Sequence, residues 1–346
     1  MRTIIYGAGA IGGTVGGHLA RAGYDVVLIG RPGHVAAIRR DGLRFVTPTG
    51  THTLRVPAVT HPAEIDWRPG DVVFLCVKGQ NTAEALRDLQ AALAQPAHHA
   101  TRTTPDVPRL TFDVPLFCLQ NGVRNEELAA RVFARVYGVM VRVGGVYLQE
   151  GEVIARRDPP GLLIIGRYPS GADELAEAVA GQLRAAGFTA PVTPDVMAYK
   201  WGKLLSNLAN AVGAITDAGG EDPDHARIVG AARREAEALM RQAGIRWVPP
   251  QEIEQQYPEV GREVRGKVSV RAGSSTWQSL ARGQGSVESD FLNGEIVRLA
   301  ARLGATAPVN AGLARIASEM AARREKPGRY SAKELAALLE CQSSDA

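Results

Sequence analysis

Apolar runs and helix-like segments alternate along the first half of the chain. The earliest runs are Thr3–Tyr6 and Asp25–Ile29, with a helix-like segment between them. Two later runs, Val72–Val77 and Leu116–Leu119, enclose a helical stretch from Thr82 to about Leu93. Strands that alternate with helices favour a parallel, doubly wound sheet, so the pattern predicts an α/β domain at this end of the chain.

The pattern then becomes less regular. Leu43–Thr60 alternates and contains Pro and Gly, which predicts an extended or hairpin excursion, and residues 94–111, rich in Pro, His and Thr, are expected to form a surface loop. The Gly-punctuated, β-rich segment Arg142–Arg167 predicts an antiparallel addition to the sheet. A helix from about Asp173 to Ala186 closes the domain.

After Pro194 the periodicity becomes helical. The segments expected to be helices are 195–213, 223–243, 250–257, 286–303 and 309–324. The predicted fold class is therefore α/β, with an N-terminal Rossmann-type doubly wound sheet and a C-terminal all-helical domain. The boundaries expected are 1–188 for the first domain, 189–340 for the second and 341–346 for a polar tail.

Composition narrows the class of protein. In 346 residues, 40 Lys and Arg face 36 Asp and Glu, and this small, dispersed excess does not favour nucleic acid as a partner. No apolar run is long enough to span a membrane, and the N-terminus enters a strand pattern directly without a signal peptide, so a cytoplasmic protein is expected. The three cysteines, Cys76, Cys118 and Cys341, lack metal-ligand or disulfide spacing, so no metal site is predicted.

Glycines between the first strand and the first helix match a dinucleotide-binding fingerprint. Gly7 permits the tight turn, Gly9 lets the backbone approach a pyrophosphate, and Gly12 allows close packing of helix on sheet. The amides at the start of the helix then face the phosphates. The residues expected along the cofactor here are Gly7, Ala8, Gly9, Ala10, Ile11 and Gly12.

The end of the second strand indicates which dinucleotide is bound. Enzymes that use NAD generally carry a carboxylate there, whereas this chain has Gly30-Arg31. A guanidinium can pair with a 2′-phosphate, so NADPH/NADP+ is favoured. The alternative is that Arg31 is a solvated loop residue.

A second cluster lies at the start of the helical half. Lys203, Asn207 and Asn210 are spaced i, i+4 and i+7, so on a continuous helix they share one face. An ammonium and two amides on one face suit a small anionic substrate. An ordinary solvated stripe remains the alternative.

Other candidates follow strands or begin helices. Lys78 directly follows the predicted strand ending at Val77, and Asn121 follows the one ending at Leu119. The carboxyl ends of parallel strands form the ligand crevice in such sheets. Ser274-Ser275 precede Glu288, which lies at the opening turn of a predicted helix. The alternatives are an ordinary Asn-Gly turn and a helix-capping role for Glu288.

In combination these motifs resemble the ketopantoate reductase (2-dehydropantoate 2-reductase) family over about residues 1–325. The segments that carry the resemblance appear in the family's order: Gly7-Ala-Gly-Ala-Ile-Gly12, Val77-Lys78, Gln120-Asn121-Gly122, Lys203-Leu-Leu-Ser-Asn207, Ser274-Ser275 and Glu288-Ser-Asp-Phe-Leu-Asn-Gly294. The resemblance implies an NADPH-binding Rossmann domain, a helical domain and an active site between them.

The resemblance also implies roles for individual residues. Lys203 would be the general acid that protonates the substrate carbonyl oxygen, and Glu288 would hydrogen-bond the substrate hydroxyl and orient that lysine. Ser275, with Ser274, would bind the substrate carboxylate. Asn207, with Asn210, would bind substrate. Asn121 would position the lysine or the nicotinamide, and Lys78 and Arg31 would lie along the cofactor.

Three positions depart from the family's pattern. Ala211 and Ala272 stand where the family commonly has asparagine, and Ser279 replaces an aspartate. Because these changes touch substrate contacts, reduction of a 2-oxo acid is better supported than ketopantoate itself. The alternatives left open are a reductase of another small anionic ketone and a non-catalytic NADP(H)-sensing protein. The expected partner is a small 2-oxo acid, without nucleic acid or membrane, and a homodimer is left open.

Overall fold

The structure is a computed structural model that describes residues 1–94, 113–216, 218–219, 221–261 and 273–339. The chain divides into two compact units. The first takes its described residues from Met1–Gln120, Asn125–Met197 and Glu254–Ser269, and the second from Asn121–Arg124, Ala198–Ile253 and Val270–Ala346. Apart from residue 94, which ends a helix, the predicted loop 94–111 lies outside the described residues, as do Ala272 and the predicted tail 341–346.

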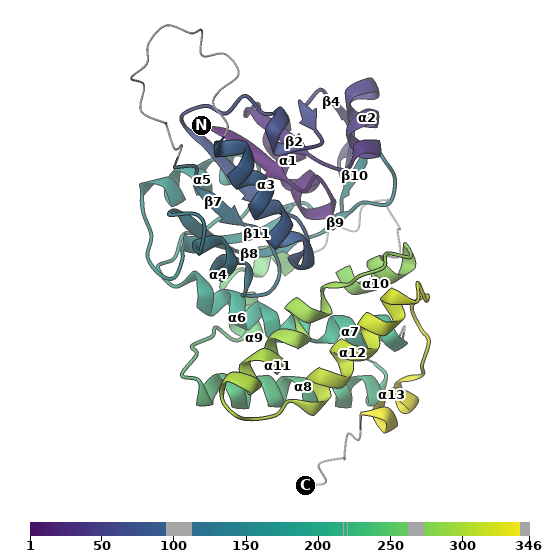
Figure 1. Ribbon diagram of the computed structural model, residues 1–346. Coiled ribbons are helices and arrows are strands. Elements are labelled where there is room, and N and C mark those ends of the chain that lie inside the picture. Colours follow the sequence, from purple (N-terminus) through teal and green to yellow (C-terminus); the bar gives the residue numbers. More distant parts are fainter. Residues whose placement is uncertain (95–112, 217, 220, 262–272, 340–346) are drawn as a thin grey trace, which may run out of the picture. The chain divides into compact units, whose positions relative to one another are not determined.

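A seven-stranded sheet forms the centre of the first unit (Figure 1). Its strand order is β11-β8-β7-β6-β1-β2-β5, and every neighbouring pair is parallel except β11 and β8. The strands are β1 (Arg2–Tyr6), β2 (Val26–Ile29), β5 (Ala58–Val59), β6 (Asp71–Leu75), β7 (Leu116–Cys118), β8 (Val136–Val143) and β11 (Gly161–Arg167).

Both faces of this sheet are buried, because successive strand residues point to opposite sides. Ile5, Phe74 and Phe117 join one apolar core, which includes residues of α1 and α5. Their strand neighbours Ile4 and Val73 join a second core with residues of α3 and α4. The helical elements of this unit are α1 (Ala10–Arg21), α2 (Pro32–Asp41), α3 (Thr82–Ala94), α4 (Asn125–Ala130), α5 (Glu174–Ala185) and the 3-10 turns η1 (Pro62–Glu64), η2 (Gly79–Asn81) and η3 (Pro258–Gly261).

A second, four-stranded sheet belongs to the same unit. Its order is β4-β3-β10-β9, formed by β3 (Leu43–Thr47), β4 (Gly50–Leu54), β9 (Gly145–Val146) and β10 (Glu152–Ala155). β3 and β4 make the hairpin that was one of the predictions for this region. The expected antiparallel addition is confirmed for β11 against β8, whereas the residues between those two strands pair with the hairpin instead.

The second unit is helical. Its elements are α6 (Val196–Asn207), which begins just before the division, α7 (Ala209–Thr216), α8 (Pro223–Gln242), α9 (Pro250–Gln256), which continues into the first unit, α10 (Ser275–Ala281), the 3-10 turn η4 (Glu288–Phe291), α11 (Asn293–Arg302), α12 (Pro308–Ala322) and α13 (Ala332–Leu338). The predicted fold class, a doubly wound sheet followed by a helical domain, is confirmed. The helices α2, α4, α10 and α13 were not predicted.

A buried polar network joins three helices of the second unit. The Glu235 carboxylate on α8 accepts the backbone N–H groups of Val309 and Asn310 at 2.9 and 3.0 Å, which satisfies amides at the start of α12. The Asn310 amide in turn accepts from Asn293 Nδ2 of α11 at 3.0 Å. Asn293 and Asn310 are fully buried, so each bond also avoids the cost of an unsatisfied polar group.

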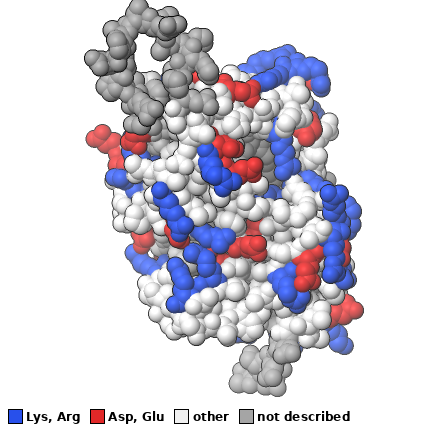
Figure 2. All heavy atoms as spheres, in the orientation of Figure 1, with Lys and Arg blue, Asp and Glu red and all other residues white. Residues whose placement is uncertain are grey.

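Charged side chains of both signs lie on the surface formed by the described residues. Figure 2 shows one face on which Lys and Arg lie in several separate groups with Asp and Glu near them. None of the helices that the structure describes has both the length and the apolar character needed to cross a membrane.

A histidine lies inside the apolar core of the first unit. His18 of α1 is 5% exposed and packs edge-on against the rings of Phe45 and Phe188, at centroid distances of 5.0 and 5.3 Å. Neither ring nitrogen has a hydrogen-bond partner among the described residues. Burial, reinforced by the charges of Arg21 and His52, lowers the pKa of His18 to about 4.

This buried imidazole predicts a loss of stability in mild acid. Its pKa is near 6.5 in the unfolded chain, so its neutral form stabilises the fold fully above that pH and this contribution disappears as the pH falls toward 4. The shift corresponds to about 3 kcal/mol. We expect the wild type to lose up to that amount of unfolding free energy, relative to His18→Leu, as the pH falls from 7 to 4. Denaturant titration of both proteins at the two pH values measures this difference. A pH-independent difference would contradict the prediction.

Candidate functional site

The Gly-rich turn after β1 is built for close packing. Gly7 has φ +109, and a Cβ on it would lie 2.7 Å from the Val77 backbone nitrogen. A Cβ on Gly12 would lie 2.2 Å from the Gly7 carbonyl oxygen and 2.7 Å from Ile5 Cγ2. Neither position can accept a side chain, so α1 sits directly against the sheet at this point.

Gly9 differs from its neighbours because it faces open space. A Cβ built there would meet no atom within 4 Å. Gly9 is the N-cap of α1, no side chain caps the helix, and its first turn carries no acidic residue. The first-turn amides therefore lack intrahelical partners and point outward with the positive end of the helix dipole, so these residues fit the pyrophosphate of a dinucleotide.

Two predicted cofactor residues share the edge of the sheet where this turn lies. β1 lies between β6 and β2, and all three strands are parallel, so their carboxyl ends meet. Lys78 follows β6, is half-buried and is the N-cap of η2, while Arg31 follows β2 and is the N-cap of α2. Arg31 is exposed, and among the described residues its guanidinium has no hydrogen bond or ion pair. It is thus available to an external anion.

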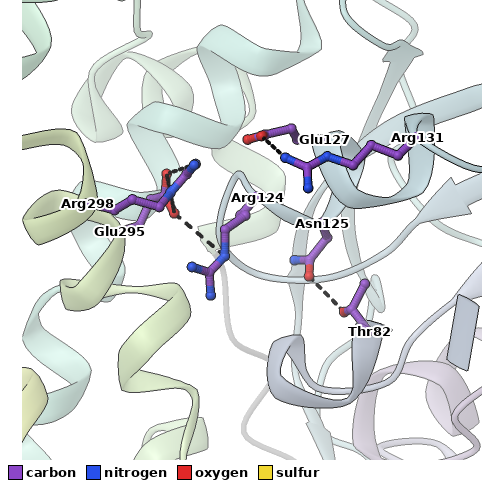
Figure 3. Close-up of polar contacts among 7 residues, drawn as sticks. All are labelled: Thr82, Arg124, Asn125, Glu127, Arg131, Glu295 and Arg298. Carbon is purple, nitrogen blue, oxygen red and sulfur yellow. Dashed lines mark hydrogen bonds and ion pairs between the residues drawn. The ribbon is translucent and has the colours of Figure 1, made fainter. Parts of the chain in front are cut away.

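The ends of β6 and β7 are fastened to each other by side chains that were not predicted to contribute. Gln120 Nε2 donates to the Val77 carbonyl and to Thr82 Oγ1, each at 2.8 Å. Thr82 Oγ1 also donates to Asn125 Oδ1 at 2.8 Å, which links the start of α3 to the start of α4 (Figure 3). No periodicity in the sequence marks these contacts, because they join residues distant along the chain.

The segment between these bonds, Asn121–Arg124, belongs to the second unit. Gly122 has φ +81, and a Cβ there would lie 2.6 Å from the Phe291 carbonyl oxygen. The Arg124 guanidinium lies over the Phe291 ring, 3.9 Å from its centroid. Asn121, predicted to position the lysine or nicotinamide, is therefore adjacent in sequence to residues packed on η4, the turn that contains Glu288.

A buried carboxylate anchors the end of this segment (Figure 3). Glu295 is 0% exposed, and its carboxylate accepts from Arg298 at 2.5 to 3.1 Å. Arg124 Nε lies 3.9 Å from the same carboxylate. A carboxylate without solvent needs cationic or hydrogen-bond partners, so both arginines offset the cost of its burial. Arg124, Glu295 and Arg298 were not predicted as site residues.

The expected single helix over 195–213 is wrong. α6 ends at Asn207 and α7 begins at Ala209, so Asn210 is on a different helix from Lys203 and Asn207. At the junction the Leu208 carbonyl accepts from Asn293 Nδ2 at 3.4 Å. These tertiary bonds to the backbone cannot be seen in the periodicity of one segment. Asn207 is buried, and Lys203 and Asn210 are half-buried.

The serine pair lies at the start of α10, beside α7. Ser274 is the N-cap: its hydroxyl accepts from the Trp277 N–H and donates to the Asn210 carbonyl, both at 3.2 Å. The structure therefore brings Ser274 and Asn210 together. Ser275 Oγ is buried and has no hydrogen-bond partner among the described residues. It is thus a donor and acceptor that a ligand can satisfy.

Glu288 lies in a different element from the one predicted. The helix expected over 286–303 is interrupted at Leu292, whose φ of −114 and ψ of −92 are not helical, so α11 begins only at Asn293. Glu288 therefore opens the 3-10 turn η4 and is 7% exposed. A carboxylate so deeply buried needs partners of its own, which distinguishes it from a solvated capping residue.

Sulfur and metal chemistry find little support in the described residues. Cys118 is fully buried in β7, and burial raises the pKa of the half-buried Cys76 thiol. Cys341 lies outside the described residues. Within the described ranges, no group of three or more His, Cys, Asp or Glu side chains could hold a metal ion.

Comparison with known proteins covers both units. Residues 3–170 match the family model "Ketopantoate reductase PanE/ApbA", and residues 195–321 match its C-terminal model. A 2-dehydropantoate 2-reductase of Pyrococcus horikoshii is 32% identical over 90% of this chain and 94% of its own length. The crystal structure of a PanE/ApbA family ketopantoate reductase from Ralstonia eutropha JMP134 is 30% identical, with a TM-score of 0.74 over 94% of this chain and 99% of its own.

A further structure shares the fold alone. It is the ternary structure of D-mandelate dehydrogenase with NADH and anilino(oxo)acetate, which is 20% identical and has a TM-score of 0.77 over 94% of this chain and 99% of its own.

The open space at Gly9 predicts that a substitution there can weaken dinucleotide binding without lowering the stability of the fold. Gly9→Ala introduces a methyl group that meets no protein atom but lies where the backbone should approach a pyrophosphate. We expect its melting temperature to stay within about 2 °C of the wild type, since no core contact changes. Its dinucleotide affinity, measured by calorimetric titration, should fall about tenfold or more. Unchanged affinity would show that the turn does not contact the cofactor.

Two of the ion pairs drawn in Figure 3 predict different costs on substitution. Arg124 is 24% exposed and faces the buried Glu295, whereas Arg131 is 66% exposed and pairs with Glu127 on the surface of α4. We expect Arg124→Met to lower the free energy of unfolding by about 2 kcal/mol, because Arg298 still serves the buried carboxylate. Arg131→Met, the matched control, should cost less than about 0.5 kcal/mol. Equal costs in denaturant titration would contradict a structural role for Arg124.

Proposed function

Because the chain belongs to the ketopantoate reductase PanE/ApbA family, we propose that it reduces 2-dehydropantoate (ketopantoate) to (R)-pantoate with NADPH as the hydride donor. The observation that carries the proposal is the match of both halves of the chain to the family, together with a relative named 2-dehydropantoate 2-reductase that aligns over 90% of the chain. The reaction would belong to pantothenate and coenzyme A biosynthesis.

Cofactor binding is assigned to residues 1–188 and substrate binding to residues 189–340. The open amides at Gly9 support the pyrophosphate contact. Arg31, at the end of β2, has no side-chain partner among the described residues, which supports NADPH over NADH. Lys78 follows the neighbouring strand and would lie along the same cofactor. Asn121 would face the nicotinamide end.

The protein would contribute a proton donor for the substrate carbonyl oxygen and would stabilise the negative charge that develops there. Bound NADPH would supply the hydride to the substrate's keto carbon. Negative charge that develops on the carbonyl oxygen would be stabilised and then neutralised by the Lys203 ammonium, which gives up one proton and is recharged from solvent. Glu288 would hydrogen-bond the substrate hydroxyl and orient Lys203, a role supported by its burial in η4.

The substrate's carboxylate would be held by neutral donors. Ser275 Oγ is buried without a partner among the described residues, which supports its assignment to this group. Ser274 would act by holding the start of α10 and the Asn210 carbonyl in place. Asn207 on α6 and Asn210 on α7 would complete the substrate contacts.

A second candidate function is reduction of another small 2-oxo acid or anionic ketone. It is favoured by Ala211, which is 1% exposed and offers no polar group, and by Ser279, whose hydroxyl donates to the Ser275 carbonyl at 2.8 Å. Both positions would be polar contacts in the family's common pattern. A non-catalytic NADP(H)-sensing protein is the remaining alternative.

The proposal is tested by following NADPH oxidation with 2-dehydropantoate and a panel of branched 2-oxo acids. Lys203→Ala should lower kcat by about 100-fold to 10,000-fold, the range typical of a lost general acid, while its NADPH affinity stays within about twofold. Lys333→Ala, a loss of the same charge on an exposed face of α13, should keep full activity.

Three other outcomes of this assay would distinguish the alternatives. Turnover of a different 2-oxo acid but not of 2-dehydropantoate would establish the second candidate. NADPH binding without turnover of any compound would establish the sensing alternative. Full activity in Lys203→Ala would remove the general-acid assignment.

A further inference from the structure

A carboxylate lies at the helix start that follows β2, although the sequence of that region contains none. Glu150, in the turn between β9 and β10, lies against Gly33 in the first turn of α2. A Cβ built on Gly33 would be 3.2 Å from the Glu150 carboxyl carbon and 3.3 and 3.4 Å from its two oxygens. The turn and α2 lie side by side in the first unit (Figure 1).

The position of this carboxylate is set by its neighbours. Tyr147 donates its hydroxyl to Glu150 Oε2 at 3.0 Å, and the Tyr147 ring packs edge-on against His34 of α2 at a centroid distance of 4.7 Å. The Gly151 N–H donates to His34 Nδ1 at 2.9 Å. The β9–β10 turn is thus tied to the start of α2 on both sides of Glu150.

The charge of Glu150 is not neutralised by these contacts. His34 Nδ1 lies 3.9 Å from Glu150 Oε2, but His34 is 2% exposed and burial lowers its pKa, an effect only partly opposed by Glu150. The ring is therefore neutral near pH 7, and its Nδ1 accepts a hydrogen bond as a neutral imidazole does. Tyr147 contributes a neutral hydroxyl. Glu150, 54% exposed at its side chain, remains an anion that faces solvent.

The start of α2 is also where a 2′-phosphate would bind. Arg31 is its N-cap and Pro32 has no N–H, while the Val35 N–H donates to the Arg31 carbonyl. The amides of Gly33 and His34 are left at the positive end of the helix dipole, beside the Arg31 guanidinium, which has no partner in the described part of the chain. Glu150 lies at this same turn, so a carboxylate and an incoming phosphate dianion would compete for one positive region.

We propose that Glu150 is a specificity-determining residue that opposes Arg31, repelling the 2′-phosphate of NADPH and offering an acceptor to the ribose 2′-hydroxyl of NADH. The preference of the chain for NADPH over NADH is then smaller than it would be if Arg31 acted alone. The acceptor comes from the β9–β10 turn rather than from the end of β2, where NAD enzymes generally have it. This inference rests on the proposed function, because it assumes a nicotinamide dinucleotide on the Gly-rich turn.

The experiment measures dissociation constants of NADPH and NADH by calorimetric titration of the full-length wild type and three variants. Glu150→Gln keeps the shape and the Tyr147 contact but removes the charge. Glu174→Gln is the matched control, because Glu174 is an exposed glutamate of α5, which packs on β11 at the opposite edge of the sheet. Arg31→Gln removes the opposing charge. Melting temperatures confirm that each variant is folded.

We expect Glu150→Gln to tighten NADPH binding about fivefold and to leave NADH unchanged or weaken it by about twofold, as for loss of one like charge near a half-exposed site. Arg31→Gln should shift the ratio of the two constants in the opposite direction, and Glu174→Gln should not move it. Because the Glu150→Gln effect is electrostatic, it should shrink in high salt.

Two results would overturn the inference, and they are distinguishable. If NADPH binds and Glu150→Gln leaves the ratio equal to that of Glu174→Gln, Glu150 does not sense the 2′-phosphate and only this inference fails. If neither dinucleotide binds the wild type, the proposed function fails as well. Should Glu150→Gln unfold, Glu150→Ala under the same titrations provides the deciding comparison.

Discussion

The close approach of α1 to the sheet governs what the first unit can bind. Gly7 and Gly12 have no room for a Cβ, because the Val77 backbone and the Gly7 carbonyl occupy that space. The helix therefore starts almost in contact with the strands and directs its first amides over the carboxyl ends of β1, β2 and β6. Arg31 and Lys78 follow two of these strands, so the parallel strand order brings candidate cofactor residues that are far apart in sequence to one edge of the sheet.

The second unit buries several polar side chains together with its apolar core. Glu295, Asn293 and Asn310 are fully buried. Asn293 and Asn310 bond to residues of other elements, whereas Glu295 pairs with Arg298 of its own helix and with Arg124 of the Asn121–Arg124 segment. Such bonds add little net stability when formed but are costly to break, so they select one arrangement of the helices. Candidate substrate residues Asn207 and Asn210 flank one such bond, from Asn293 to the Leu208 carbonyl at the α6–α7 junction.

The sequence was informative where the signal is local. The strand, the three glycines and the helix that follow one another near the N-terminus are sufficient to predict the turn geometry, and Gly30-Arg31 shows directly that β2 ends without a carboxylate. The continuous helix predicted over 195–213 is interrupted at Leu208, whose carbonyl accepts a bond from Asn293, a residue more than eighty positions away. Glu150 was not predicted for the same reason, because nothing in the neighbouring sequence indicates its contact with Gly33 of α2. Contacts of this kind require the fold.

The Asn121–Arg124 segment lies in the N-terminal half of the sequence but belongs to the second unit, which matters when the two units are produced separately. A gene cut at the division after Met197 would leave these four residues on the N-terminal polypeptide, although they pack with the C-terminal one. The C-terminal product, made alone, would retain Arg298 but not Arg124 beside Glu295, and it would lack the Gly122 backbone that packs against the Phe291 carbonyl. We therefore expect that reconstitution from separately produced halves would have to restore the contacts of these four residues with the C-terminal fragment.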